Sequence, residues 1–386
     1  MEPHHVTPPG RRRLRALAGL LAVAVLAGCG LRLETPPPAE PVPDALEIVR
    51  RTAVSDALYV ADQADAVVDR LDGRRARLTA ELERVAADSR AQAAQLGGVY
   101  DSGLEPTEPP TGSPAPSSEP VQAQDVVDAL VDASGRSRTA ASTTVEGPLA
   151  RLLASIGAAQ AVSAQRVGAY TDAGPPPTQV ATVPAPDGTA IVEVEPSGES
   201  PAADAAGSAG SGLAALTAAS PSPSPSATDD GEVSSTGGDS DAPAPLPRGL
   251  TAADLSTLVA SEDSAAYALR LRAALRTDDR RAALAGRADT HGARSEAWAL
   301  LAGTAGTAQD PRRVAYAVPR GAGDGALVRS VENDLATTYA TIVGTTAPDT
   351  RGALVDLLVD CALALEAWGA EPVPFPGLPE QADDAG

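Results

Sequence analysis

The 386-residue chain contains no lysine, so all 30 of its basic residues are arginines. Aromatic residues make up only 2% of it, and there are two cysteines and three histidines. The absence of lysine excludes lysine-based covalent chemistry. The shortage of histidine and cysteine restricts transition-metal sites, because these residues supply the usual nitrogen and sulfur ligands. With so few aromatic side chains, the apolar core must come from smaller residues.

Alanine, leucine and valine supply most of the 43% hydrophobic content. Alanine is the best helix former and fills little core volume, so we expect slender, closely packed helices. The net charge is −21, and removing residues 1–28, with four arginines and one glutamate, leaves about −24. Because this charge repels nucleic acid and no basic stripe offsets it, we expect no nucleic-acid partner.

The first 28 residues have the pattern of a secretory signal peptide. Four arginines precede a short uncharged segment, which is too short to cross about 30 Å of hydrocarbon as a helix. The segment ends in Leu26, Ala27, Gly28 and Cys29, which resembles the lipobox of bacterial lipoproteins. In that family the cysteine receives diacylglycerol and the chain is cut just before it. The resemblance therefore implies a lipid-anchored protein on the outer face of the cytoplasmic membrane.

An ordinary secretory signal with a chance cysteine is the alternative, and it leaves the position and surroundings of that cysteine unexplained. The doublet Arg12-Arg13 leaves the choice between general and twin-arginine export open. Residues 29–43 include Pro36–Pro38 and are predicted to form an extended tether. The other cysteine, Cys361, falls on the apolar face of a predicted helix, where we expect a small buried hydrophobic residue.

Apolar residues recurring at spacings of three and four predict two helical blocks. The first covers 44–173, with a flexible insertion at about 101–121 that is rich in proline, serine and glutamate. The second covers 250–380 and is followed by a tail at 381–386. The predicted helices lie near 44–72, 74–96, 122–143, 147–170, 251–276, 280–303, 324–343 and 348–369. Four amphipathic helices per block favour an all-α fold of two antiparallel four-helix bundles.

Between the blocks, residues 174–249 are predicted to form a disordered linker of proline, serine, glycine and acidic residues. The segment contains no aromatic residue, and Ser220–Ser226 alternates serine with proline. Such a composition buries too little apolar surface to offset the entropy lost on ordering. A short hairpin near Asp187 is the alternative, which Pro184 and Pro186 disfavour. Across this linker we expect the two blocks to move independently.

Several segments of the second block carry a family resemblance. They are the helix around Glu262, His291 with Arg294, Ala315–Pro319, Glu332 with Tyr339, and the stretch Trp368–Glu380. Together they resemble a ferritin-like domain of unknown function that occurs in lipoproteins of high-GC Gram-positive bacteria. A weaker likeness covers Leu149–Ile156 in the first block. The resemblance implies two tandem ferritin-like bundles and carries no established activity.

Three residues of the second block form the candidate site. Glu262, His291 and Glu332 are each in helical phase with apolar residues, so they are predicted to point inward. They form a polar cluster that holds one metal ion or a buried hydrogen-bond network. A hydrogen-bonded core histidine with partly exposed carboxylates is much the more common arrangement, and we favour it over metal binding. A ferritin-type site with two histidines is excluded within one mature chain, because His291 is the only histidine after residue 28.

The first block offers poorer ligands. Where the family carries acidic residues and histidines, this chain has Asp88 with Gln92, and Gln160 with Ser163. Glutamine and serine are poor ligands for a transition metal, so we expect no metal site there.

Catalytic motifs are missing from the sequence. No nucleophile elbow, phosphate-binding loop, Cys-x-x-Cys or His-Glu-x-x-His motif occurs. We therefore predict a non-enzymatic, membrane-anchored lipoprotein with a binding or scaffolding role, whose partner is an envelope protein or an unidentified small molecule. No cofactor is expected besides the lipid on Cys29. The alternative is a ferritin-like metal-binding protein; a solute-binding lipoprotein is disfavoured because no repeated βα pattern occurs.

Overall fold

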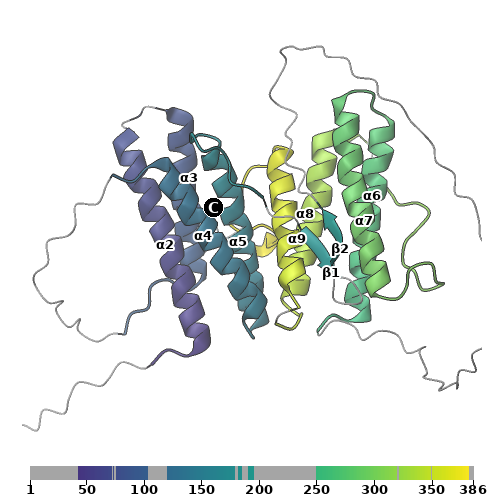
Figure 1. Ribbon diagram of the computed structural model, residues 1–386, viewed down its shortest axis with the longest axis horizontal. Helices are drawn as coiled ribbons and strands as arrows, with labels where there is room; N and C mark the ends of the chain where they lie inside the picture. Colours follow the sequence, from purple (N-terminus) through teal and green to yellow (C-terminus); the bar gives the residue numbers. More distant parts are fainter. Residues whose placement is uncertain are drawn as a thin grey trace, which may run out of the picture. The chain divides into compact units, whose positions relative to one another are not determined.

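The computed structural model contains eight α-helices and one two-stranded hairpin in the part of the chain that it describes (Figure 1). That part comprises residues 42–71, 73, 75–102, 120–178, 181–184, 190–194, 249–319, 321–348 and 350–381. The predicted signal peptide, Cys29, most of the tether, most of the 101–121 insertion and nearly all of the tail lie outside the described residues. Among the described helices, none combines the length and hydropathy needed to cross a membrane.

The helices follow one another in two groups of four. The first group is α2 (Ala45–Leu71), α3 (Ala76–Gln95), α4 (Ala123–Thr143) and α5 (Gly147–Gly168). The second group is α6 (Ala252–Ala274), α7 (Asp279–Leu301), α8 (Asp324–Val343) and α9 (Gly352–Ala367). A short 3-10 turn at Pro379–Gln381 follows. The all-α prediction is confirmed, and each predicted helix is present with bounds that differ by only a few residues.

Local sequence signals set the ends of these helices. Thr251 and Asp254 form a capping box at the start of α6. The Asp254 amide donates to the Thr251 hydroxyl at 3.0 Å, and the Thr251 amide donates to the Asp254 carboxylate at 2.9 Å. α3 ends where Gly97 and Gly98 adopt φ values of 94° and 71°. The Gly98 amide there donates to the Ala93 carbonyl at 2.8 Å, which closes the last turn.

The hydrophobic core continues from the first helical group into the second. One cluster of buried residues includes Leu153 and Ile156 from α5 together with Leu354 and Leu358 from α9. α5 is rich in alanine, glycine and serine, so its backbone can approach another helix closely, and α9 packs against it. The expected independent motion of the two blocks therefore does not fit the structure, because both blocks bury apolar surface in a common core.

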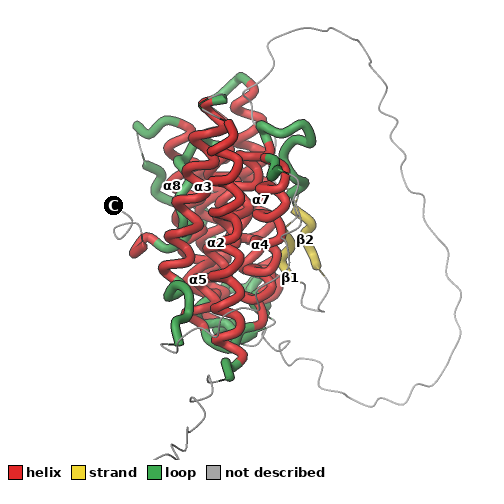
Figure 2. The backbone as a smooth tube through the Cα atoms, turned by 90° about the vertical axis from the view of Figure 1, so that its left-hand side faces the viewer, coloured by secondary structure: helices red, strands yellow, loops and turns green. Residues whose placement is uncertain are grey.

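A short hairpin follows α5. Strands β1 (Ala181–Pro184) and β2 (Ala190–Val194) pair antiparallel, with Ala181 opposite Val194. The register shifts between Val183 and Pro184, which is how the sheet accommodates the proline. Ala181 and Val183 are buried, and the hairpin contacts α7 and α9. Figure 2 shows the two strands at one edge of the helices. Within the predicted linker the structure thus shows the hairpin, while residues 195–248 of that linker lie outside the described residues.

Candidate functional site

The three predicted site residues meet in the core of the second helical group. Glu262 comes from α6, His291 from α7 and Glu332 from α8, and none of the three is exposed to solvent. The imidazole of His291 lies between the carboxylates, with Nδ1 at 2.6 Å from Glu262 Oε2 and Nε2 at 3.1 Å from Glu332 Oε1. The alternative with partly exposed carboxylates does not fit, because both carboxylates are fully buried.

Two arginines complete this buried cluster. Arg287 makes two hydrogen bonds to Glu332, at 2.5 and 2.6 Å, and its third nitrogen lies 2.7 Å from Asp360. Arg294 pairs with the same Asp360 at 2.8 Å. The cluster therefore holds three carboxylates and two guanidinium groups. Its formal charges balance when His291 is protonated.

The electrostatics agree with a protonated His291. Burial lowers the pKa of this imidazole, but the carboxylates of Glu262 and Glu332 outweigh burial, so the pKa is raised. Burial alone would raise the pKa of Glu332, yet Arg287 and His291 hold it well below its usual range. Asp360 behaves in the same way: burial opposes ionisation, but the neighbouring arginines lower its pKa. The pKa directions of His291, Glu332 and Asp360 therefore all favour the charged forms of these side chains inside the bundle.

Two further side chains border the cluster. The hydroxyl of Tyr339 donates to Glu262, and burial together with this carboxylate raises the pKa of Tyr339 well above its usual value. Cys361 is fully buried, as predicted, and burial raises the pKa of its thiol well above the usual range. A thiol held in the neutral form is a poor nucleophile and a poor metal ligand.

This donor set does not fit a metal ion. Both imidazole nitrogens of His291 face carboxylates, and Arg287 occupies both oxygens of Glu332. The guanidinium groups add positive charge where a cation would have to sit. Within the described part of the chain, no group of three or more histidine, cysteine, aspartate or glutamate side chains has the arrangement of a metal site. The cluster is therefore best described as a structural ion-pair network.

Sequence reasoning missed two members of this network, although a signal existed for each. Arg287 lies one helical turn before His291 on α7, so it occupies the same inward face. Asp360 is the charged neighbour of Cys361 within residues 357–365 of α9, which are otherwise apolar. An ionised residue within a buried helical face requires a partner of opposite charge. These two signals together predict an ion pair between Arg287 and Asp360.

The first helical group holds uncharged polar residues instead. Gln92, Gln160 and Ser163 are buried, and the Ser137 hydroxyl lies 3.3 Å from the side-chain oxygen of Gln160. The Gln92 amide donates to the Pro374 carbonyl at 3.2 Å, which joins α3 to the segment after α9. Gln92 and Gln160 thus form hydrogen bonds that join segments far apart in the chain.

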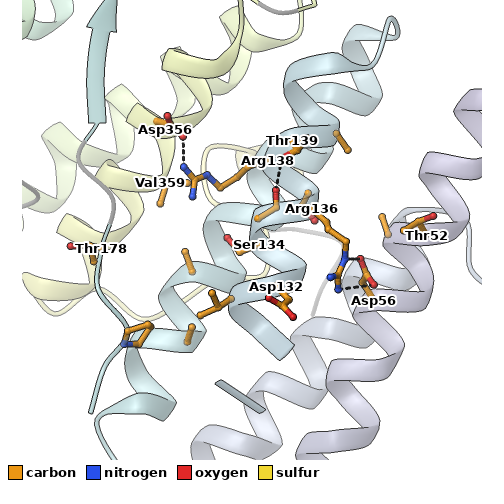
Figure 3. Close-up of a pocket in the computed structure, with 18 of the residues that line it drawn as sticks. Thr52, Asp56, Asp132, Ser134, Arg136, Arg138, Thr139, Thr178, Asp356 and Val359 are labelled. Carbon is orange, nitrogen blue, oxygen red and sulfur yellow. Dashed lines mark hydrogen bonds and ion pairs between the residues drawn. The ribbon is translucent and has the colours of Figure 1, made fainter. Parts of the chain in front are cut away.

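A groove that the sequence did not reveal lies along α4. It has a volume of about 750 Å³ and is bordered by α2, α9, the end of α5 and residues 176–178 (Figure 3). Its apolar lining includes the side chains of Ile48, Val49, Val131, Ala140, Val359 and Leu363. Gly135 lies on α4 within this lining, and a Cβ atom there would meet nothing within 4 Å. The space above Gly135 is therefore open.

Two ion pairs stand at opposite sides of the groove. Arg136 reaches Asp56 of α2, with hydrogen bonds of 2.7 and 3.0 Å, and Arg138 pairs with Asp356 of α9 (Figure 3). The two arginines point to opposite sides of α4, so each side carries one hydrogen-bond donor group and one acceptor group. Asp132 adds a third carboxylate to the lining.

The comparisons with known proteins identify one domain. Residues 254–380 match a domain of unknown function, DUF4439, and this match spans α6 to α9 almost completely. It includes the whole buried cluster and leaves the first helical group outside. No curated protein and no solved structure shows significant similarity to the chain.

Proposed function

We propose that this protein is a non-enzymatic lipoprotein, anchored to the outer face of the membrane through Cys29, that binds an elongated amphipathic molecule along α4. The 750 Å³ groove is the observation that carries the proposal. Its volume falls within the range of about 300–1,000 Å³ that small-molecule sites occupy. The buried cluster has no comparable opening, because all its members are closed off from solvent.

The lining of the groove determines the class of ligand. The apolar side chains of Ile48, Val131 and Val359 favour the apolar body of a molecule. Each side of the groove offers an arginine beside an aspartate, so polar groups that both donate and accept hydrogen bonds fit best there. The lining contains two arginines and three aspartates, which disfavours an anionic ligand.

A pair of fluorescent dyes tests this proposal. We expect the neutral dye N-phenyl-1-naphthylamine to bind the full chain more tightly than the anionic dye 1-anilinonaphthalene-8-sulfonate. Gly135→Phe should fill the open space above α4 and weaken binding of the neutral dye at least about tenfold, equivalent to about 1.4 kcal/mol.

Gly286→Phe is the matched control. Gly286 is also an exposed glycine within a helix, with nothing within 4 Å of an added Cβ, but it lies on α7 outside the groove. Its substitution should leave dye binding unchanged. Equal binding to both variants, or no binding to the original protein, would rule out the groove as the ligand site.

The membrane anchor is part of the same proposal and has its own support and test. The lipobox-like Leu26-Ala27-Gly28-Cys29 supports it, as does the likeness of the second block to ferritin-like domains of lipoproteins. We expect an alkyne-tagged fatty acid, fed to producing cells, to label the full chain. Cys29→Ala should abolish the label and Cys361→Ala should retain it, since the chain has only these two cysteines. Label that persists in Cys29→Ala would contradict lipidation at this residue.

A further inference from the structure

A second, smaller pocket lies between α6 and α8. Its volume is about 390 Å³, and residues from the loop between α7 and α8 form one of its walls. Ser261 and Ser264 of α6, Asp334 of α8, and Arg313 and Tyr316 of the loop contribute its polar lining. The remaining lining side chains are Ala260, Ala265, Val331, Leu335 and Thr338.

The loop that carries Arg313 and Tyr316 is held in place by α6. The Tyr316 hydroxyl donates to Asp263 at 2.7 Å, and the Arg313 amide donates to the same carboxylate at 3.2 Å. The ring of Tyr316 also contacts that of Tyr267, with centroids 5.8 Å apart. The Tyr316 side chain and the backbone of Arg313 are thus held at the pocket by contacts within the protein. The two rings are inclined at 58° to each other, and only Tyr316 lines the pocket, where it is the one aromatic residue of the lining.

The polar groups of the pocket retain unused hydrogen-bonding capacity. The guanidinium group of Arg313, the carboxylate of Asp334 and the hydroxyls of Ser261 and Ser264 make no hydrogen bond or ion pair with other residues that the structure describes. Partial burial raises the pKa of Asp334, and no cation nearby offsets this effect. All four side chains line one hollow, where Arg313 and Asp334 are exposed and the two serines are half-buried, so each is accessible to a polar ligand.

We propose that this pocket binds an acidic sugar, a single pyranose ring that carries a carboxylate. Arg313 would pair with the carboxylate, because the planar guanidinium group matches it with two parallel hydrogen bonds. Asp334 and the two serines would bond to ring hydroxyls, which both donate and accept. The apolar face of the ring would lie on Tyr316, since aromatic rings offer a flat apolar surface.

Other ligand classes fit this pocket less well. An apolar ligand would bury four polar side chains without partners, which is unfavourable. A phosphate or sulfate ion would pair with Arg313 but would leave the Asp334 carboxylate without a donor and the Tyr316 ring without an apolar partner. The volume of 390 Å³ lies near the lower end for ligand sites, about 300 Å³, which suits one ring. The inference does not depend on the α4 groove.

Two sugars that differ in one group provide the test. We titrate the full chain with D-galacturonate and with D-galactose, and follow binding by calorimetry and by saturation transfer from the protein to the sugar. Galacturonate should bind at least about tenfold more tightly than galactose, the ratio that one charge-assisted contact of about 1.4 kcal/mol produces. Arg313→Ala should remove this preference, and Asp334→Asn should weaken binding of both sugars.

Arg270→Ala is the matched control, because Arg270 is an exposed arginine of α6 that pairs with Asp289 away from the pocket. It should leave both affinities unchanged, and Gly135→Phe should do the same. The proposal is overturned if neither sugar binds, or if Arg313→Ala and Arg270→Ala have the same effect. Competition by acetate as strong as that by galacturonate would also overturn it, since the site would then recognise a carboxylate and not a sugar.

Discussion

Arg287 and Glu332 form a bidentate ion pair inside the second helical group, with nitrogen–oxygen distances of 2.5 and 2.6 Å. At most 1% of either side chain is exposed. A buried pair of this kind contributes little net stability compared with apolar residues, because desolvation offsets the attraction. The ion pair instead fixes the position of α7 relative to α8, because both hydrogen bonds form only in one arrangement of the two helices. The remaining charges of the cluster extend this requirement to α6 and α9.

Removing one partner of this pair should destabilise the fold strongly. We expect Arg287→Met to lower the free energy of unfolding by about 3–5 kcal/mol, because Glu332 and Asp360 would lose a buried counter-charge. Urea denaturation followed by circular dichroism measures this loss. Arg270→Ala breaks an exposed pair and should cost no more than about 1 kcal/mol. Equal losses in the two variants would show that the buried network is not important for stability.

The raised pKa of His291 should make stability depend on pH. Its protonated form is stabilised only in the folded state, so this contribution is fully present below the unfolded pKa of about 6.5. The contribution is lost as the pH rises through the folded pKa. We expect the free energy of unfolding to decrease as the pH rises above about 6.5, and His291→Gln to flatten that dependence. A stability that increases with pH over this range would contradict a charged His291.

The close contact between the two helical groups should not tolerate a larger residue. A Cβ atom added at Gly147 would lie 1.9 Å from the carbonyl oxygen of Gly344, in the turn between α8 and α9. Gly147→Ala should therefore destabilise the protein by about 1–3 kcal/mol through overpacking. Gly286→Ala, in open space on α7, should instead stabilise it by up to about 1 kcal/mol. Thermal unfolding of both variants checks this, and a neutral Gly147→Ala would mean that the contact is not tight.

The arginines of the buried cluster should keep metal ions out. We expect the full chain, purified without chelators or a histidine tag, to contain no stoichiometric iron or manganese by mass spectrometry. The reason is that Arg287 and His291 already satisfy the carboxylate of Glu332. Retention of a metal that disappears in His291→Ala would contradict this account and restore the metal-binding alternative.

The eight helices could be predicted because their signals are local. The capping box at Thr251, the glycines after α3 and the apolar spacing of each helix lie within a few residues of the feature that they define. The inward positions of Glu262, His291 and Glu332 followed from the same helical phase. The distances between these three residues could not be predicted in this way. Helical phase shows which face of its own helix a residue occupies, but not which other helix that face contacts.

The sequence by itself determined the helices, the acidic charge, the exclusion of a two-histidine metal site and a lipobox-like segment ending at Cys29, all of which depend on composition or neighbouring residues. Only the tertiary structure decided that Arg287 and Asp360 neutralise the cluster and that the two helical groups share a core. It alone produced the groove along α4 and the pocket beside Tyr316. These features join residues that lie far apart in the chain, and the packing of side chains between helices brings such residues together.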